Sequence, residues 1–150
     1  EAIAATGSEA RYRSVDVTNT SALATVLEET RTDWGPIRAL VHGAGVLADR
    51  LIVDQTDAQF DHIFDTKVEG LRALFGALTQ DPLKVIGLFS SVSARCGNNG
   101  QSTYAMANET LNKIAWAESR ARGGDVLVKS FGWGPWEGGM VNPQLKELQK

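Results

Sequence analysis

Short apolar runs alternate with longer amphipathic stretches along this chain, and that alternation limits its fold more than any other feature. The strand candidates are residues 10–17, 37–42, 84–89 and 125–131. Three of them contain nearly continuous apolar runs, which suit parallel strands covered on both faces. The pattern therefore predicts an α/β fold with about four strands and flanking helices.

The stretches between these runs have helical periodicity. We expect helices over about 18–32, 56–78 and 101–122. Thr18 is the expected cap of the first, and Gly123-Gly124 is the expected end of the last. The middle stretch has one apolar stripe, with spacings of three and four, at Phe60, Ile63, Phe64, Val68, Leu71, Leu74, Phe75 and Leu78.

Composition excludes several classes of protein. The chain has 150 residues, the size of one domain or part of one, and a net charge of −3 without a dense basic block, so nucleic acid is not an expected partner. No apolar run is long enough to cross a membrane, and no signal peptide is visible. The single cysteine, Cys96, excludes intrachain disulfides and multi-cysteine zinc sites, so we expect no metal and a cytoplasmic location.

A glycine-bearing turn follows the second strand candidate, at His42-Gly43-Ala44-Gly45. Glycines allow a flat ligand to approach the backbone, and ligands of open parallel sheets lie at the carboxyl ends of the strands. A tight strand-to-helix turn without a ligand explains the same residues equally well.

Hydroxyl groups close the third strand candidate at Ser90, Ser91 and Ser93, and Tyr104 and Asn108 follow at a helix start. The spacing of four puts the phenol and the amide on one helix face, where both could point into the crevice at the strand ends. Taken alone, the spacing favours ordinary strand-end serines and a half-buried tyrosine, because serine-rich turns are common.

These segments together resemble the short-chain dehydrogenase/reductases, and within them the ketoreductase domains of polyketide and polyunsaturated fatty acid synthases. The resemblance is colinear and covers nearly the whole chain. It implies a Rossmann-like, doubly wound parallel sheet, of which this chain would be the C-terminal part. The segments that carry it are Val15-Asp16-Val17, residues 42–47, Phe89-Ser90-Ser91, residues 104–108 and Trp133-Gly134-Pro135-Trp136.

The resemblance implies a catalytic tetrad of Lys67, Ser91, Tyr104 and Asn108. Most members of the superfamily have lysine four residues after the tyrosine, where this chain has Asn108. In the ketoreductase branch the asparagine and lysine exchange places, which assigns the lysine to Lys67. A solvated surface lysine is the alternative, because Thr66 and Glu69 are its polar neighbours.

The implied reaction is the NADPH-dependent reduction of a 3-oxoacyl thioester on an acyl carrier protein. A phenol ordinarily ionises near pH 10, so Tyr104 needs a nearby ammonium group to donate its proton at neutral pH. Ser91 would hold the carbonyl oxygen, and Asn108 would order Lys67 and a water molecule. A nicotinamide cofactor supplies the hydride in this family.

The same resemblance implies the remaining binding residues. Asp49, the last residue of Leu47-Ala48-Asp49, matches the end of a leucine-aspartate-aspartate motif, and Cys96 stands where the opposite stereochemical class has tryptophan; both favour the D-hydroxy product. Asp49 could equally be an ordinary loop carboxylate. Met140-Val141 would form an apolar wall for the acyl chain. The implied cofactor contacts are Asp16, Val17, His42, Gly43, Ala44, Gly45, Lys67, Tyr104, Gly134 and Pro135.

No glycine-rich phosphate fingerprint follows a first strand, so we expect residues 1–150 to be an N-terminally truncated ketoreductase domain. Unpaired strand edges would then leave the isolated chain poorly stable and inactive. The expected partners are the absent part of the same domain and other synthase domains. Two alternatives stay open: a stand-alone dehydrogenase for a small alcohol or ketone, and a non-catalytic structural half-domain.

Overall fold

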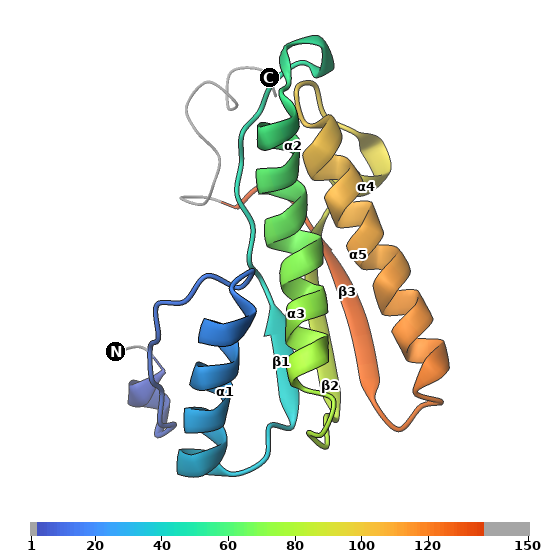
Figure 1. Cartoon of the computed structure of the whole chain (residues 1–150). Helices are drawn as coiled ribbons and strands as arrows, with labels where there is room; N and C mark the ends of the chain where they lie inside the picture. The colour runs from blue at the N-terminus through green and yellow to red at the C-terminus, as the bar shows by residue number, and fades with distance from the viewer. Residues whose placement is uncertain (1–2, 137–150) are drawn as a thin grey trace.

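The chain forms one parallel sheet with helices packed over it (Figure 1). The computed structural model describes residues 3–136. The strands are β1 (Ala39–His42), β2 (Val85–Ser91) and β3 (Leu127–Trp133). The helices are α1 (Thr20–Trp34), α2 (Asp57–Phe64), α3 (Gly70–Ala77), α4 (Ser93–Cys96) and α5 (Ser102–Ala121), with short turns η1 (Ala4–Thr6), η2 (Ile52–Asp54) and η3 (Asp65–Glu69).

The sheet has the order β1-β2-β3, and both pairs are parallel. Its register aligns Leu40 with Ile86 and Leu88 with Ser130. A parallel α/β fold is therefore confirmed, with three strands in the described residues. All three strands run in one direction, so their carboxyl ends meet at one edge of the sheet.

The expected strand over residues 10–17 is wrong. This segment forms no strand, because within the described residues no strand pairs with it. Arg11 pairs with Asp33, and the Arg13 Nε lies 3.3 Å from a Glu29 carboxylate oxygen. Tyr12 between them is 85% exposed. A strand needs a neighbouring strand to hydrogen-bond with, and the alternating pattern of these residues cannot show whether such a neighbour exists.

The helix expected over 56–78 forms, with an added feature. Thr56 caps α2 in a capping box with Gln59. The helix then continues through the π turn η3 into α3.

The helix α1 begins at Thr20, two residues later than expected. Its cap is Asn19 and not Thr18, because the Asn19 side chain accepts the N–H of Ala22.

The core lies between one face of the sheet and the helices α3 and α5 (Figure 1). α1 packs against α3 beside it. Leucines from the strands and helices fill this core. The most completely buried apolar side chains of the core are Leu71, Ile86, Leu88 and Leu111.

Gly123 and Gly124, both with positive φ, form the turn after α5, as expected.

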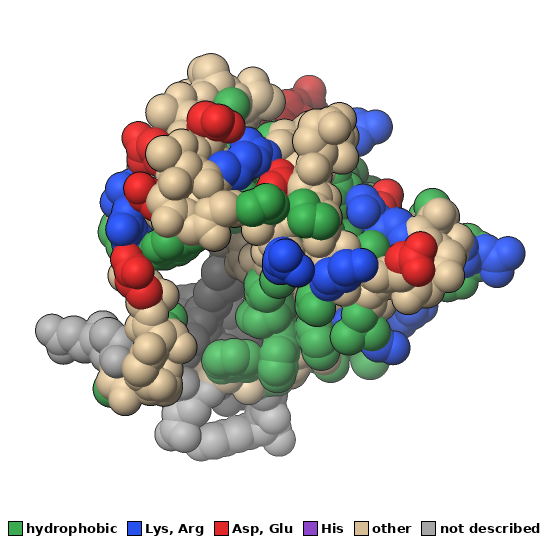
Figure 2. Space-filling model, turned by 90° about the horizontal axis from the view of Figure 1, so that it is seen from below, with side chains coloured by type: hydrophobic (Ala, Val, Ile, Leu, Met, Phe, Trp, Pro, Cys, Tyr) green, Lys and Arg blue, Asp and Glu red, His purple; other side chains and the backbone are tan. Residues whose placement is uncertain are grey.

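The opposite face of the sheet is open in the described residues. Val41, Val85, Leu127 and Phe131 alternate with the buried strand positions and are 39% to 62% exposed. Figure 2 shows hydrophobic side chains gathered in the lower part of the view. Within residues 3–136, the helices therefore cover one face only.

Candidate active site

A cavity of about 560 Å³ lies at the edge where the three strands end. The turn after β1, the end of β2, the beginning of α5 and the segment after β3 line it, together with Lys67 from η3. Its wall is mixed. Ser91, Tyr104 and Gln101 contribute polar groups, and Trp133 and Trp136 contribute aromatic surface.

Lys67 lies inside the protein and not on its surface. Its side chain reaches the cavity from the π turn, and the residue is 4% exposed. Nζ donates to the carbonyl oxygen of Phe89 at 3.2 Å and of Ala44 at 3.4 Å. Burial lowers the pKa of Lys67 from 10.5 to about 8, so the group loses its charge as pH rises through about 8.

Tyr104 faces the same cavity from the first turn of α5. The Lys67 Nζ lies 5.6 Å from the centre of the phenol ring. An ammonium group over an aromatic ring at this distance makes a cation–π contact. The structure thus brings together two of the residues that the sequence nominated from separate segments.

Ser91 reaches the cavity from the last position of β2. Its Oγ lies 2.6 Å from the Oγ of Ser93 and accepts the N–H of Ser93 at 3.2 Å. Ser93 is buried at the start of α4. These contacts orient the Ser91 hydroxyl at the cavity wall.

Asn108 lies behind the cavity wall. It is completely buried, and its Nδ2 donates to the carbonyl oxygen of Tyr104 at 2.8 Å. The Ser90 hydroxyl in turn donates to the Asn108 carbonyl oxygen at 3.1 Å. Within the described residues, the Asn108 Oδ1 has no hydrogen-bond partner, so the site has a buried acceptor for a further donor.

The residues of the glycine turn after β1 differ in where they lie. Gly43 and Gly45 line the cavity, whereas His42 is buried beneath it and its Nε2 donates to the carbonyl oxygen of Lys67 at 2.9 Å. Burial lowers the pKa of His42, so this ring is neutral and acts as a support for the π turn. A side chain on Gly45 would stand 3.0 Å from the Lys67 Cε.

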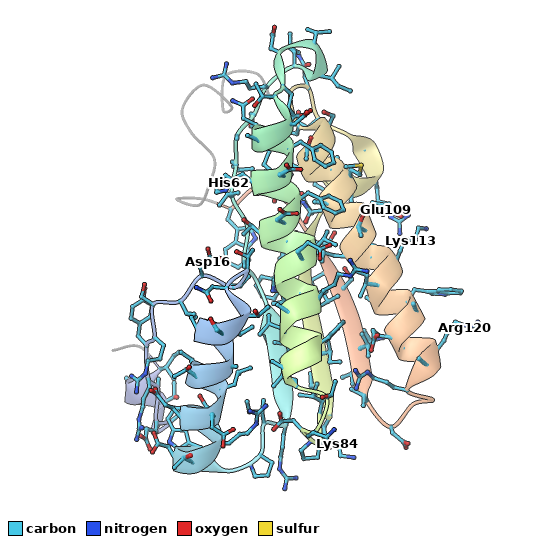
Figure 3. The ribbon with its side chains drawn as sticks, in the orientation of Figure 1. Asp16, His62, Lys84, Glu109, Lys113 and Arg120 are labelled. Atoms are coloured by element: carbon cyan, nitrogen blue, oxygen red, sulfur yellow. The ribbon has the colours of Figure 1, made fainter. Side chains whose placement is uncertain are left out.

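Four of the nominated cofactor residues are not part of the cavity wall: His42 and Ala44 in the glycine turn, and Asp16 and Val17 farther away. Asp16 is exposed at the turn into α1 (Figure 3) and accepts the N–H and hydroxyl of Thr18, which lowers its pKa. Val17 packs against Gly70 at the start of α3. Gly134 and Pro135 line the cavity.

The two nominated substrate residues are placed differently from each other. Asp49 is exposed and accepts the Nε2 hydrogen of Gln101 at 2.9 Å, while Gln101 and Leu47 line the cavity. Met140 lies outside the described residues.

Sequence reasoning overlooked Gln101 and the cavity role of Trp133. Gln101 had a usable signal, because it stands three residues before Tyr104 and shares a helix face with it. Within residues 3–136, no helix is long and apolar enough to span a membrane, and no group of three His, Cys, Asp or Glu side chains is arranged to hold a metal ion.

Comparison with known families and sequences gives matches over nearly the whole chain. The KR domain family model matches residues 1–138. A polyunsaturated fatty acid synthase protein of Thraustochytrium sp. is 45% identical over 147 residues, which cover 97% of this chain and 5% of that protein. The polyketide synthase PksN of Bacillus subtilis is 33% identical over 149 residues, which cover 95% of this chain and 3% of that one.

Solved structures agree with this result. A ketoreductase domain from the bacillaene assembly line has a TM-score of 0.86 and 34% identity, covering 99% of this chain and 36% of that chain. A ketoreductase from the first module of phoslactomycin biosynthesis in a Streptomyces species has a TM-score of 0.86 and 35% identity, covering 99% and 34%. The chain thus spans about a third of the length of these solved structures.

Proposed function

The chain belongs to the KR (ketoreductase) domain family, and from this we propose that its cavity reduces the ketone of a 3-oxoacyl thioester, presented on an acyl carrier protein, with NADPH. The product is the 3-hydroxyacyl thioester. The observation that carries the proposal is the meeting of Lys67, Ser91 and Tyr104 in one cavity. The other domains of a multidomain synthase are the proposed partners, because the matched relatives are such synthases.

Reduction converts the C=O double bond into a new C–H bond and a new O–H bond. When bound, the nicotinamide supplies the hydride for carbon. Tyr104 donates its hydroxyl proton to the oxygen. Ser91 donates a hydrogen bond to the same oxygen, where negative charge develops, and Lys67 stabilises the phenolate that remains. The charged form of Lys67 does this work, so activity depends on its protonation.

The residues present fit the nicotinamide end of such a cofactor. Gly43 and Gly45 expose backbone at the cavity wall, and the Lys67 ammonium is a donor for ribose hydroxyls. The unpartnered Oδ1 of Asn108 provides an acceptor for a water molecule behind Tyr104. NADPH rather than NADH follows from the resemblance to synthase ketoreductases.

The substrate enters on the apolar side of the cavity in this proposal. Leu47, Val92 and Trp136 contribute its apolar lining, which suits an acyl chain next to a polar carbonyl. The D-hydroxy product rests on the resemblance at Asp49 and on the absence of tryptophan at Cys96.

The test is NADPH oxidation with a simple 3-oxoacyl thioester in the full-length protein that contains this chain. Tyr104→Phe removes the proton donor and should lower turnover at least about a hundredfold, the contribution of a general acid. Tyr12→Phe is the matched control, because Tyr12 is the only other tyrosine and is 85% exposed away from the cavity.

A wild-type protein that folds but does not oxidise NADPH with the thioester would contradict the proposal. Equal loss in both tyrosine variants would contradict the role given to Tyr104. If the wild type reduced a small free ketone far better than the thioester, the stand-alone dehydrogenase would become the better description.

A further inference from the structure

Two segments that are distant in the sequence are joined beside the cavity. Residues 49–55 lead from the glycine turn toward α2, and residues 100–103 begin α5; their loops meet at the upper end of Figure 1. Three hydrogen bonds join them, which together we name the loop clamp: Arg50 N–H to the Gly100 carbonyl oxygen at 2.8 Å, Gln101 Nε2 to Asp49 Oδ2 at 2.9 Å, and Thr103 Oγ1 to Gln55 Oε1 at 2.6 Å.

The side chain of Gln101 is held at both of its polar atoms. Nε2 donates to Asp49, and Oε1 accepts the Nδ2 hydrogen of Asn98 at 3.1 Å. Although Gln101 lines the cavity, it is only 7% exposed. Its carboxamide is therefore a fixed part of the wall, and its own hydrogen bonds are directed into the protein.

The backbone is built for this close approach. Gly100 has a φ of +75°, and a side chain on it would stand 3.7 Å from the backbone of Arg50. Glycine adopts this conformation without the steric cost that other residues would have. The contact between the loops is thus a feature of the main chain as well as of the side chains.

Tyr104 projects from the helix turn that the loop clamp holds. Gln101 and Thr103 flank the start of that turn, and the Gln101 carbonyl oxygen accepts the N–H of Ala105 at 2.8 Å. The other end of the clamped segment leads back to Ala44, whose carbonyl oxygen accepts from Lys67. The loop clamp therefore connects the support of Tyr104 with the support of Lys67.

We propose that Asp49 is a positioning residue, which acts through Gln101 to fix the start of α5 and thereby the place of the Tyr104 hydroxyl. Asp49 is exposed and is not part of the cavity wall, whereas its partner Gln101 is. The catalytic consequence rests on the proposed function; the mechanical consequence, a fixed helix start, does not.

The experiment compares three variants of the full-length protein. Asp49→Ala removes the acceptor. Asp49→Asn keeps an acceptor oxygen without the charge. Asp54→Ala is the matched control. It removes a carboxylate of the same segment, and within the described residues this carboxylate accepts no hydrogen bond.

Two readouts are measured: hydrogen exchange of the amides in residues 98–106, and kcat and KM for NADPH-dependent reduction of a 3-oxoacyl thioester. Asp49→Ala should speed exchange in these amides and lower kcat about three- to tenfold with little change in KM, the effect of losing one hydrogen bond. Asp49→Asn should recover most of the slow amide exchange and most of kcat. Asp54→Ala should match the wild type in both readouts.

A double variant completes the test. Since Asp49 acts through Gln101, Asp49→Ala combined with Gln101→Ala should be no worse than the more severe single variant. Multiplying losses would overturn the proposal. So would unchanged amide exchange in Asp49→Ala, or a rise in KM that Asp49→Asn shares, since the carboxylate would then act on the ligand directly.

The two proposals fail in different ways. If the wild type does not reduce the thioester, the proposed function fails, and amide exchange alone decides whether the loop clamp holds the helix start. The other case is a wild type that reduces the thioester and a Tyr104→Phe variant that does not. If Asp49→Ala then leaves amide exchange and the kinetic constants unchanged, only the positioning role of Asp49 is refuted.

Discussion

Replacing Lys67 by methionine should stabilise the protein at neutral pH while it removes activity. The lysine pKa falls from 10.5 to about 8 on folding, which corresponds to about 3 kcal/mol of unfavourable free energy at pH 7. Methionine has a similar length and no charge. It also loses the hydrogen bonds to Phe89 and Ala44, which costs about 1 kcal/mol. The expected gain in the free energy of unfolding at pH 7 is about 2 kcal/mol.

The sign of the pH dependence follows from proton counting. Between about 8 and 10.5 the unfolded wild type still binds the lysine proton and the folded wild type has lost it, so the wild type gains stability as pH rises. The stability advantage of Lys67→Met is therefore complete below about pH 8 and shrinks as pH rises toward 10.5. Above pH 10.5 the variant is less stable than the wild type by about 1 kcal/mol, because only the lost hydrogen bonds still count.

Denaturant unfolding of the complete domain at neutral and alkaline pH measures this difference. Lys84→Met is the control, because Lys84 is exposed at the end of the sheet away from the cavity (Figure 3). It should show no pH-dependent difference from the wild type. A Lys67→Met difference that does not change with pH, or a loss of stability at pH 7, would refute the account of Lys67 as a buried, desolvated charge.

Three further outcomes are expected. Turnover should fall as pH rises through about 8, because Lys67 loses its charge there, and a profile flat to pH 10 would contradict this. Gly45→Ala should lower kcat about tenfold by displacing the Lys67 ammonium, and Gly43→Ala should do less, because its methyl would meet only the Phe89 ring at 3.6 Å. Gly70→Ala should destabilise by about 1–3 kcal/mol through collision with Val17, and Val17→Ala should restore most of that loss in thermal unfolding.

The sequence could predict the elements that their own residues determine. The apolar stripe from Phe60 to Leu78 predicted the long helix, because helical periodicity depends on neighbours within a few positions. Residues 10–17 have a strand-like pattern and form no strand, since pairing depends on a partner elsewhere. The π turn left no trace, because the apolar spacing stays at three and four across it.

The site was predictable in part for the same reason. Strand-end serines and the helix-start tyrosine could be located from periodicity, and Lys67 only from family resemblance, since its polar neighbours also suit a surface position. The bond between Asp49 and Gln101 joins residues 52 positions apart, and no local pattern encodes such a contact. Burial of Lys67 likewise depends on Gly45 and His42 from another strand end.

The π turn at Asp65–Glu69 also restricts how this chain can change in length. A π turn is an α-helical turn with one extra residue, so deleting one residue there would turn it into a regular α-helical turn. The faces of α2 and α3 would stay in register, and only the side chains inside the turn would change place. Lys67 lies inside the turn, so its side chain would leave the cavity. We therefore expect a screen of single-residue deletions to be tolerated at the exposed Ser8 and rejected at Thr66.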